Sequence, residues 1–179
     1  MDLFESGCDV LVDAVNCVGV SGKGLALAFK QRFPAYQAAY AQACHQNQVA
    51  PGKCFLYATN SGSGSGSGSG SRLPTDPKYI ISVPTKRHWR DPSTMQDVKA
   101  SVEDMVAQLN GLPLNEVRSV AIPALGCGLG GLPWSEVEPM MVTALKELHP
   151  NIVATIIPPQ AAPQLKTGLQ QSTKTRRMI

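Results

Sequence analysis

The stretch from Val15 to Lys30 (VNCVGVSGKGLALAFK) decides the fold, because the end of an apolar strand, a glycine-rich loop and a helix follow one another directly. Glycines in such a loop permit backbone angles and close approaches that side chains prevent. The first N–H groups of the helix have no partner within it, and they point into the loop with the positive end of the helix dipole. The stretch therefore predicts a site for an anion, and a phosphate or diphosphate fits best.

A second stretch, Ile122 to Trp134 (IPALGCGLGGLPW), repeats the order of apolar strand, glycine loop and helix start. Two such loops facing each other would hold a diphosphate from both sides. The residues from Gly126 to Gly131 also match the dinucleotide pattern GxGxxG, but the acidic residue expected about 20 positions later is missing. A purely structural glycine turn remains an alternative. Ser21–Gly24 is not a P-loop, because a glycine follows Lys23 where serine or threonine is required.

The composition indicates one domain with a single core, since 43% of the 179 residues are hydrophobic. We expect a cytoplasmic protein, because no apolar run of about 18 residues and no signal peptide is present. The five cysteines are widely spaced and include no CxxC pair, so neither a disulfide framework nor a metal site is indicated. No cofactor is expected.

The formal net charge of +3 is concentrated at the end of the chain. The tail from Gln160 carries four basic residues and no acidic one, so the remainder is nearly neutral. Broad electrostatic binding to nucleic acid needs many phosphate contacts and is not expected. Any contact with DNA must be local.

Apolar runs and helical spacing predict an α/β fold, with a mixed central sheet and helices on both faces. Capping-box patterns predict that Ser93 and Ser135 begin the third and fourth helices, with Gln96 and Glu138 as their partners. We expect a single domain over residues 1–159, interrupted at 61–71 by a Gly-Ser repeat typical of engineered linkers. Residues 160–179 form a polar basic tail. The expected strands are 10–15, 53–59, 79–84, 117–124 and 152–157, and the expected helices are 25–32, 36–48, the segment after Ser93 and 135–149.

Lys86 lies in a basic and aromatic loop, Thr85 to Arg90 (TKRHWR), at the end of an apolar strand. Cationic neighbours and partial burial favour a neutral amine, which can act as a nucleophile or base. The alternative is an exposed surface charge. His88 and Trp89 either stack on a nucleobase or cap the core. Cys127 either has a lowered pKa near a helix start or packs in its loop, and the second interpretation is favoured.

Together, VNCVGVSGKGLALAFKQRFP, VPTKRHW and IPALGCGLGGLPW resemble the macrodomains, the ADP-ribose-binding fold. The resemblance is specific to the DNA ADP-ribosyl glycohydrolase branch, the DarG antitoxin type, which is close to the glutamate-ADP-ribose hydrolases. It implies a hydrolase that removes ADP-ribose from thymidine in single-stranded DNA and so reverses the action of a toxin. The implied partners are ADP-ribose, ADP-ribosylated single-stranded DNA and the cognate ADP-ribosyltransferase toxin. A monomer with no membrane association is expected.

The resemblance implies that Lys86 is the catalytic lysine and attacks the anomeric carbon of ADP-ribose. Arg87, His88 and Trp89 are candidates for contact with DNA. Asp2 matches the residue that recognises adenine, and Gly126 to Gly130 match the loop around the diphosphate and distal ribose. The expected ADP-ribose contacts are Asp2, Leu3, Ala14, Val15, Asn16, Gly22, Lys23, Gly24, Leu25, Ala26, Leu27, Ala28, Thr85, Gly126, Cys127, Gly128, Leu129 and Gly130.

The sequence departs from the branch at Ser21 and Ala28, where methionine and glutamine are usual. Gly130 stands where the glutamate hydrolases carry a catalytic aspartate, which favours the DNA branch. The family's first strand, which normally precedes Asp2, is missing, and residues 174–179 are a candidate replacement. A hydrolase of ADP-ribosyl-glutamate in proteins and a non-catalytic ADP-ribose-binding module remain the alternative functions.

Overall fold

The computed structural model describes residues 1–59 and 75–160. The Gly-Ser repeat at 61–71 and the tail beyond Gln160 lie outside the described residues, so the interpretations of both segments stay predictions. Among the residues that are described, no helix is long and apolar enough to cross a membrane.

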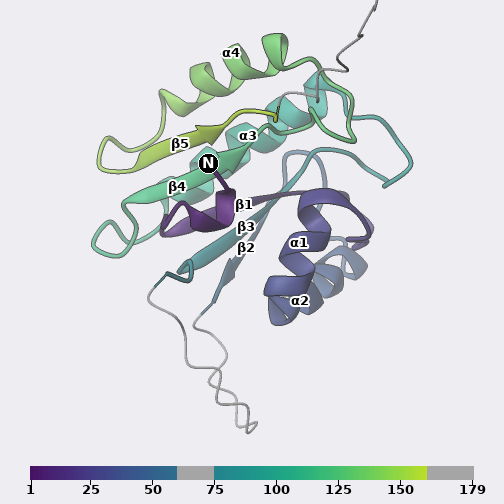
Figure 1. The fold of residues 1–179 in the computed structure, drawn as a ribbon, viewed down its shortest axis with the longest axis horizontal. Coiled ribbons are helices and arrows are strands. Elements are labelled where there is room, and N and C mark those ends of the chain that lie inside the picture. Colours follow the sequence, from purple (N-terminus) through teal and green to yellow (C-terminus); the bar gives the residue numbers. More distant parts are fainter. Residues whose placement is uncertain (60–74, 161–179) are drawn as a thin grey trace, which may run out of the picture.

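A mixed sheet of five strands forms the centre of the fold, in the order β2-β3-β1-β4-β5 (Figure 1). The central strand β1 (Val10–Val15) runs parallel to β3 (Tyr79–Pro84) and to β4 (Ser119–Pro123). β5 (Val153–Ile157) runs parallel to β4, whereas β2 (Phe55–Ala58) pairs antiparallel with β3. The carboxyl ends of four strands therefore reach the same edge.

Helices cover both faces of this sheet, as the buried apolar strands predict. The helices α1 (Gly24–Arg32) and α2 (Pro34–His45) lie on one face, and α3 (Met95–Asn110) and α4 (Trp134–Leu145) lie on the other (Figure 1). A short 3-10 helix, η1 (Leu3–Glu5), precedes the first strand. The macrodomain-like α/β architecture expected from the sequence is confirmed.

The expectation of a single core is wrong, because each layer of helices has its own hydrophobic core against the sheet. β1 supplies residues to both cores because its side chains alternate between the two faces. Val10 and Val12 face the core beneath α3 and α4, whereas Leu11 and Val15 face the core beneath α1 and α2. Phe29, Tyr36 and Tyr40 fill the second core. These side chains fix the two layers against the sheet and hold the loops at its edge.

The predicted starts of the third and fourth helices are wrong. Thr94, not Ser93, caps α3, because the Thr94 hydroxyl accepts the N–H of Asp97 at 3.2 Å. Ser93 is instead buried beside a glycine loop. At α4 the N-cap is Pro133, and no side chain caps the helix. The Ser135 pattern is therefore not used.

Two predicted helix ends are also too late. α2 ends at His45, because Asn47 has a left-handed φ of 56° that the helix cannot continue through. α4 ends at Leu145 rather than at residue 149. Beyond Leu145 the side chain of Asn110 binds the backbone: it accepts the N–H of His149 at 2.8 Å and donates to the carbonyl of Glu147 at 2.9 Å.

Candidate ADP-ribose site

Two of the predicted loops are hydrogen-bonded to each other at the carboxyl edge of the sheet. The N–H of Thr85, just after β3, donates to the carbonyl of Val15 at 2.9 Å. The N–H of Cys17 donates to the carbonyl of Arg87 at 3.1 Å, and its thiol lies 3.6 Å from the carbonyl oxygen of Lys86. The backbone of the lysine loop is thus fixed against the first glycine loop.

The second glycine loop contacts both of these loops. The N–H of Ser93, three residues after the lysine loop (Thr85 to Arg90), donates to the carbonyl of Gly130 at 3.0 Å and so joins this part of the chain to the loop after β4. A Cβ atom placed on Gly24 would lie 3.9 Å from Cδ1 of Leu129, so the two glycine loops also approach each other. The three loops therefore surround one place, as the sequence predicts.

The first glycine loop is held rigid by α2. The hydroxyl of Tyr40 donates to the carbonyl of Asn16 at 2.8 Å, and the Asn16 amide closes the loop on itself through the N–H and the carbonyl of Val20. Gly19 has a φ of 80°, and a Cβ there would lie 3.1 Å from Cα of Ala41. Asn16 thus has a clear role in shaping the loop, whereas its predicted contact with ribose remains a prediction.

The start of α1 is open toward these loops. Lys23 is its N-cap residue but makes no side-chain capping bond, and the first turn holds no acidic residue. The next helix on the other layer, α3, is capped by Thr94 and has Asp97 in its first turn. An uncapped start leaves free N–H groups and an uncompensated positive dipole, which favour an anion.

Among the glycines in residues 1–59 and 75–160, Gly22 and Gly128 combine an empty Cβ position with a φ outside the left-handed region. The folding of the loops therefore does not require glycine at these two positions. A ligand that approaches the backbone closely does require it. We interpret these two residues as the walls of the predicted diphosphate cradle.

Gly130 is a glycine for a different reason, because it is packed against Ser93. A Cβ on Gly130 would overlap the Ser93 hydroxyl and would lie 2.6 Å from the carbonyl oxygen of Gly126. Gly126 itself has a φ of 76°, which favours glycine. In this arrangement position 130 has no room for an aspartate side chain.

Lys86 is half-buried, and its ammonium donates to the carbonyl of Trp89 at 3.4 Å. Arg87, expected as a cationic neighbour, is instead paired with Asp97 through two hydrogen bonds of 3.0 and 3.2 Å. Asp97 raises the pKa of Arg87 by accepting these hydrogen bonds. The guanidinium of Arg90 lies 4.5 Å from the centroid of the Trp89 ring. The lysine loop is therefore ordered by contacts among its own residues and with α3.

The pKa values of the two thiols near the loops, Cys17 and Cys127, are raised, which disfavours the reactive thiolate form. Burial, together with the nearby Cys44, raises the pKa of Cys17 to about 11. Burial also raises the pKa of Cys127, so the alternative of a lowered pKa at this position is wrong. A packing role is the better interpretation of Cys127, whose thiol lies 3.6 Å from the carbonyl oxygen of Leu125.

Several predicted contact residues offer a ligand only their backbone. The side chains of Leu3 and Val15 belong to the core beneath α1 and α2. Asp2, in contrast, is exposed and caps η1, where one of its carboxylate oxygens accepts the N–H of Phe4 at 2.9 Å. Its predicted role in recognising adenine, through the second carboxylate oxygen, remains a prediction. Ala26, Leu27 and Ala28 lie half-buried in the first turns of α1, and Ala14 is half-buried on β1.

Three residues beside the loops, Ser93, Asp97 and Arg90, have structural roles that the sequence patterns do not predict. The pattern around Ser93 predicts a helix cap, but the buried Ser93 hydroxyl has no hydrogen-bond partner within the described residues and packs against Gly130. The spacing of Thr94 and Asp97 is itself a capping pattern and was the available signal for α3. No sequence signal links Asp97 to Arg87 ten positions away.

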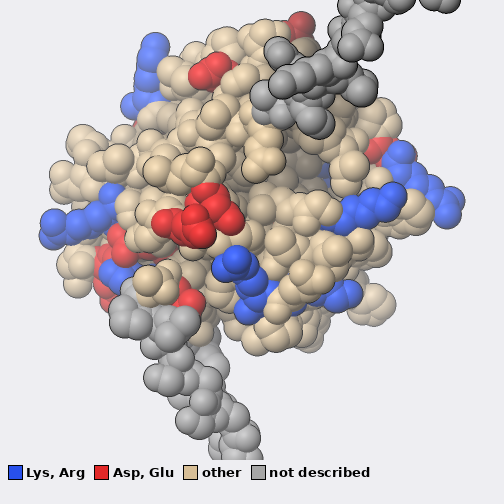
Figure 2. Space-filling view, in the orientation of Figure 1, with Lys and Arg blue, Asp and Glu red and all other residues tan. Residues whose placement is uncertain are grey.

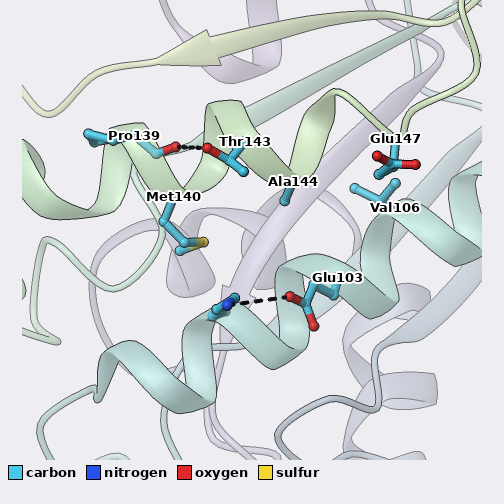
Figure 3. Close-up of a pocket in the computed structure, with 8 residues that line it drawn as sticks. Glu103, Val106, Pro139, Met140, Thr143, Ala144 and Glu147 are labelled. Atoms are coloured by element: carbon cyan, nitrogen blue, oxygen red, sulfur yellow. Dashed lines mark hydrogen bonds and ion pairs between the residues drawn. The ribbon is translucent and has the colours of Figure 1, made fainter.

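A groove of about 640 Å³ lies elsewhere, between α3 and α4 (Figure 3). Val106, Met140 and Ala144 supply apolar side chains to it, and Glu103 and Glu147 supply carboxylates. None of the residues predicted to bind ADP-ribose lines this groove. Nor do the described parts of the chain contain a group of three or more His, Cys, Asp or Glu residues able to hold a metal ion.

The structure is an α/β domain in which the two glycine loops and the loop of Lys86 meet at one edge of the sheet. The macro domain family matches residues 12–141, and the chain belongs to this family.

The chain is 39% identical over 169 residues to a DNA ADP-ribosyl glycohydrolase of Mycobacterium tuberculosis, covering 94% of this chain but 44% of that protein. The solved macrodomain of Mycobacterium tuberculosis DarG superimposes with a TM-score of 0.76 at 42% identity, covering 89% of this chain and 94% of that one. Thermosipho africanus DarTG in complex with ADP-ribose superimposes with a TM-score of 0.75 at 33% identity, and the match covers 89% of this chain and 40% of the DarTG chain. The chain thus spans less than half the length of the full proteins that it resembles.

Proposed function

We propose that this chain removes ADP-ribose from thymidine bases in single-stranded DNA. The observation that carries the proposal is that three loops meet at one edge of the sheet. They are the loop of Lys86 and two glycine loops, each of which is followed by a helix without a side-chain cap. Relatives named for DNA ADP-ribosyl glycohydrolase activity support it.

In the proposed reaction the glycine loops bind the diphosphate and so bring the distal ribose to Lys86. The Lys86 amine forms a bond to the anomeric carbon while the bond from that carbon to the thymine nitrogen breaks, and the base leaves with a proton. Water then cleaves the lysine adduct, which releases ADP-ribose and regenerates the amine. Splitting one difficult displacement into two steps is the usual advantage of a covalent intermediate.

Gly130 supports DNA rather than ADP-ribosylated glutamate as the substrate. A hydrolase of the second kind carries a carboxylate at this position, and the contact with Ser93 leaves no room for one. A simple ADP-ribose-binding module is the other alternative, in which Lys86 would only hold the loop through the Trp89 carbonyl.

The test is incubation of the chain with an oligonucleotide that is ADP-ribosylated on thymidine. We expect the parent to release ADP-ribose, Lys86→Ala to release none, and both to bind free ADP-ribose in calorimetry. Lys99→Ala is the matched control, because Lys99 lies in α3 and is paired with Glu103. Equal release by the parent and Lys86→Ala, or none by the parent, would exclude the lysine mechanism.

The biological setting is also a proposal. We infer that the chain acts in the cytoplasm as a monomer and counteracts an ADP-ribosyltransferase toxin. Size-exclusion chromatography with light scattering tests the oligomeric state. Co-expression with such a toxin tests protection, and we expect protection to require Lys86.

A further inference from the structure

The lysine loop presents an exposed aromatic ring with a cation against it. The Trp89 side chain is 46% exposed, and the Arg90 guanidinium lies 4.5 Å from its ring centroid. The carbonyl of the same Trp89 accepts the Lys86 ammonium at 3.4 Å. The exposed ring, the cation and the proposed nucleophile therefore belong to one continuous structural unit.

The two arginines of this loop differ in how they are used. Arg87 has its charge neutralised by Asp97 through two hydrogen bonds. Within residues 1–59 and 75–160, Arg90 makes no ion pair, although the exposed Asp91 follows it in the chain. Arg90 is therefore better able than Arg87 to bind a phosphate.

His88 holds the loop in this form. Its Nδ1 accepts the backbone N–H of Arg90 at 3.2 Å, and its ring lies 5.2 Å from that of Trp89, centroid to centroid. The imidazole thus has a structural task within the loop.

The face of the domain in Figure 2 shows no broad cationic surface that would replace a local contact. On the face shown in Figure 2, Lys and Arg side chains are scattered among tan surface and acidic groups. Because the formal charge of the chain before Gln160 is also close to zero, we expect binding of a DNA strand to depend on a few residues close to the reacting sugar.

We propose that Trp89 and Arg90 bind the nucleotide next to the modified thymidine, with its base stacked on the indole and its phosphate held by Arg90. The proposal rests on the proposed function and assigns the DNA phosphate contact to Arg90 instead of Arg87. Stacking on an aromatic ring accepts every base, so this site would recognise single-stranded DNA without reading its sequence. A modified protein side chain has no neighbouring base for this site.

We call Trp89 and Arg90 together the platform. Its binding to an unmodified single-stranded oligonucleotide, measured by fluorescence anisotropy at several salt concentrations, tests the proposal without an activity assay. We expect Trp89→Ala to weaken binding about tenfold and Trp89→Phe to restore most of it. Arg90→Ala should reduce the slope of log affinity against log salt by about 0.7, the value for one phosphate contact to a single strand. Arg87→Ala and the control Lys99→Ala, which removes a lysine already paired with Glu103, should keep the slope of the parent.

Turnover provides the second measurement. Trp89→Ala and Arg90→Ala should raise KM for a modified oligonucleotide several-fold with little change in kcat, and should leave KM for a single ADP-ribosylated nucleotide unchanged. Calorimetry with free ADP-ribose should give the parent's affinity for both variants. Equal loss for the oligonucleotide and the single nucleotide would overturn the proposal.

The failure of this proposal and that of the proposed function are distinguishable. If the parent binds single-stranded DNA through Trp89 and Arg90 but hydrolyses nothing, the platform stands and the enzyme proposal falls. If the parent hydrolyses the modified oligonucleotide while Trp89→Ala and Arg90→Ala bind DNA as the parent does, the platform is wrong. A larger salt effect for Arg87→Ala than for Arg90→Ala would also contradict it.

Discussion

Ser93 and Gly130 are in direct contact, and this contact joins the segment between the lysine loop and α3 to the second glycine loop. The Ser93 N–H donates to the Gly130 carbonyl at 3.0 Å, and the Ser93 hydroxyl fills the space that a side chain at position 130 would need. The loop after β4 can therefore take this form only with glycine at 130. The contact makes the shape of the site depend on two residues 37 positions apart in the sequence.

Gly130→Ala should destabilise the loop, and Gly128→Ala should not. At position 130 a methyl group meets the Ser93 hydroxyl and the Gly126 carbonyl, so we expect a loss of about 1 to 3 kcal/mol in the free energy of unfolding. At position 128 the space is empty and the φ is ordinary, so the change should stay within about 0.5 kcal/mol. Thermal unfolding measures both. ADP-ribose affinity should nevertheless fall in both variants, because the methyl group at 128 enters the cradle; full affinity of Gly128→Ala would argue against a diphosphate there.

Tyr40→Phe should loosen the first glycine loop. The Tyr40 hydroxyl is buried and donates to the Asn16 carbonyl, so its removal leaves a buried acceptor unsatisfied and should cost about 1 to 2 kcal/mol of stability. We also expect weaker ADP-ribose binding, measured by calorimetry. The control is Tyr79→Phe, because Tyr79 bonds to Glu116 at the surface and lies outside the site. A Tyr40→Phe variant with the stability and affinity of the parent would show that α2 does not hold the loop.

The free energy of unfolding should fall as the pH rises, because the buried Asp13 carboxyl is harder to ionise in the folded state than in the unfolded state. Burial raises the pKa of Asp13 to about 8, against the opposing hydrogen bond from Tyr36. The folded state therefore binds more protons than the unfolded state between about pH 4 and 8, and stability falls across this window by at most about 1.4 kcal/mol per pH unit. Asp13→Asn should remove this slope, as measured by urea unfolding at a series of pH values.

Asp9 provides a control, because its pKa is shifted in the opposite direction to that of Asp13. Burial alone would raise its pKa, but the N–H of Arg118 and the ammonium of Lys78 outweigh burial and lower it. The stability that Asp9 contributes is therefore present at neutral pH and is lost in acid, as the pH falls through its lowered pKa. Asp9→Asn should flatten the acid side of the profile only. Identical pH profiles for the parent and Asp13→Asn would contradict the prediction for Asp13.

Removal of residues 161–179 tests the proposal that the tail completes the sheet. In the described sheet β5 pairs with β4 on one side and is an edge strand, and open edges are prone to pair with further strands. If residues 174–179 add a strand there, deletion should lower the melting temperature and speed hydrogen exchange of the β5 amides. Unchanged exchange at Val153 to Ile157 would exclude the pairing.

The sequence by itself determined the α/β class, the strands and the three loops that carry the site. Long apolar runs can only be buried on both faces, and glycine-rich segments between strand and helix leave little choice of local geometry. These local signals predicted the strand from Tyr79 to Pro84 with its true bounds, and they predicted that Lys86 follows it.

Only the tertiary structure decided which side chains act together. It pairs Arg87 with Asp97 and leaves Arg90 on Trp89, and it packs Ser93 against Gly130 instead of using it as a cap. It also ends α4 early, because Asn110 bonds the backbone near His149. Such contacts join residues distant in the chain, and their strength depends on burial and geometry that no local pattern encodes.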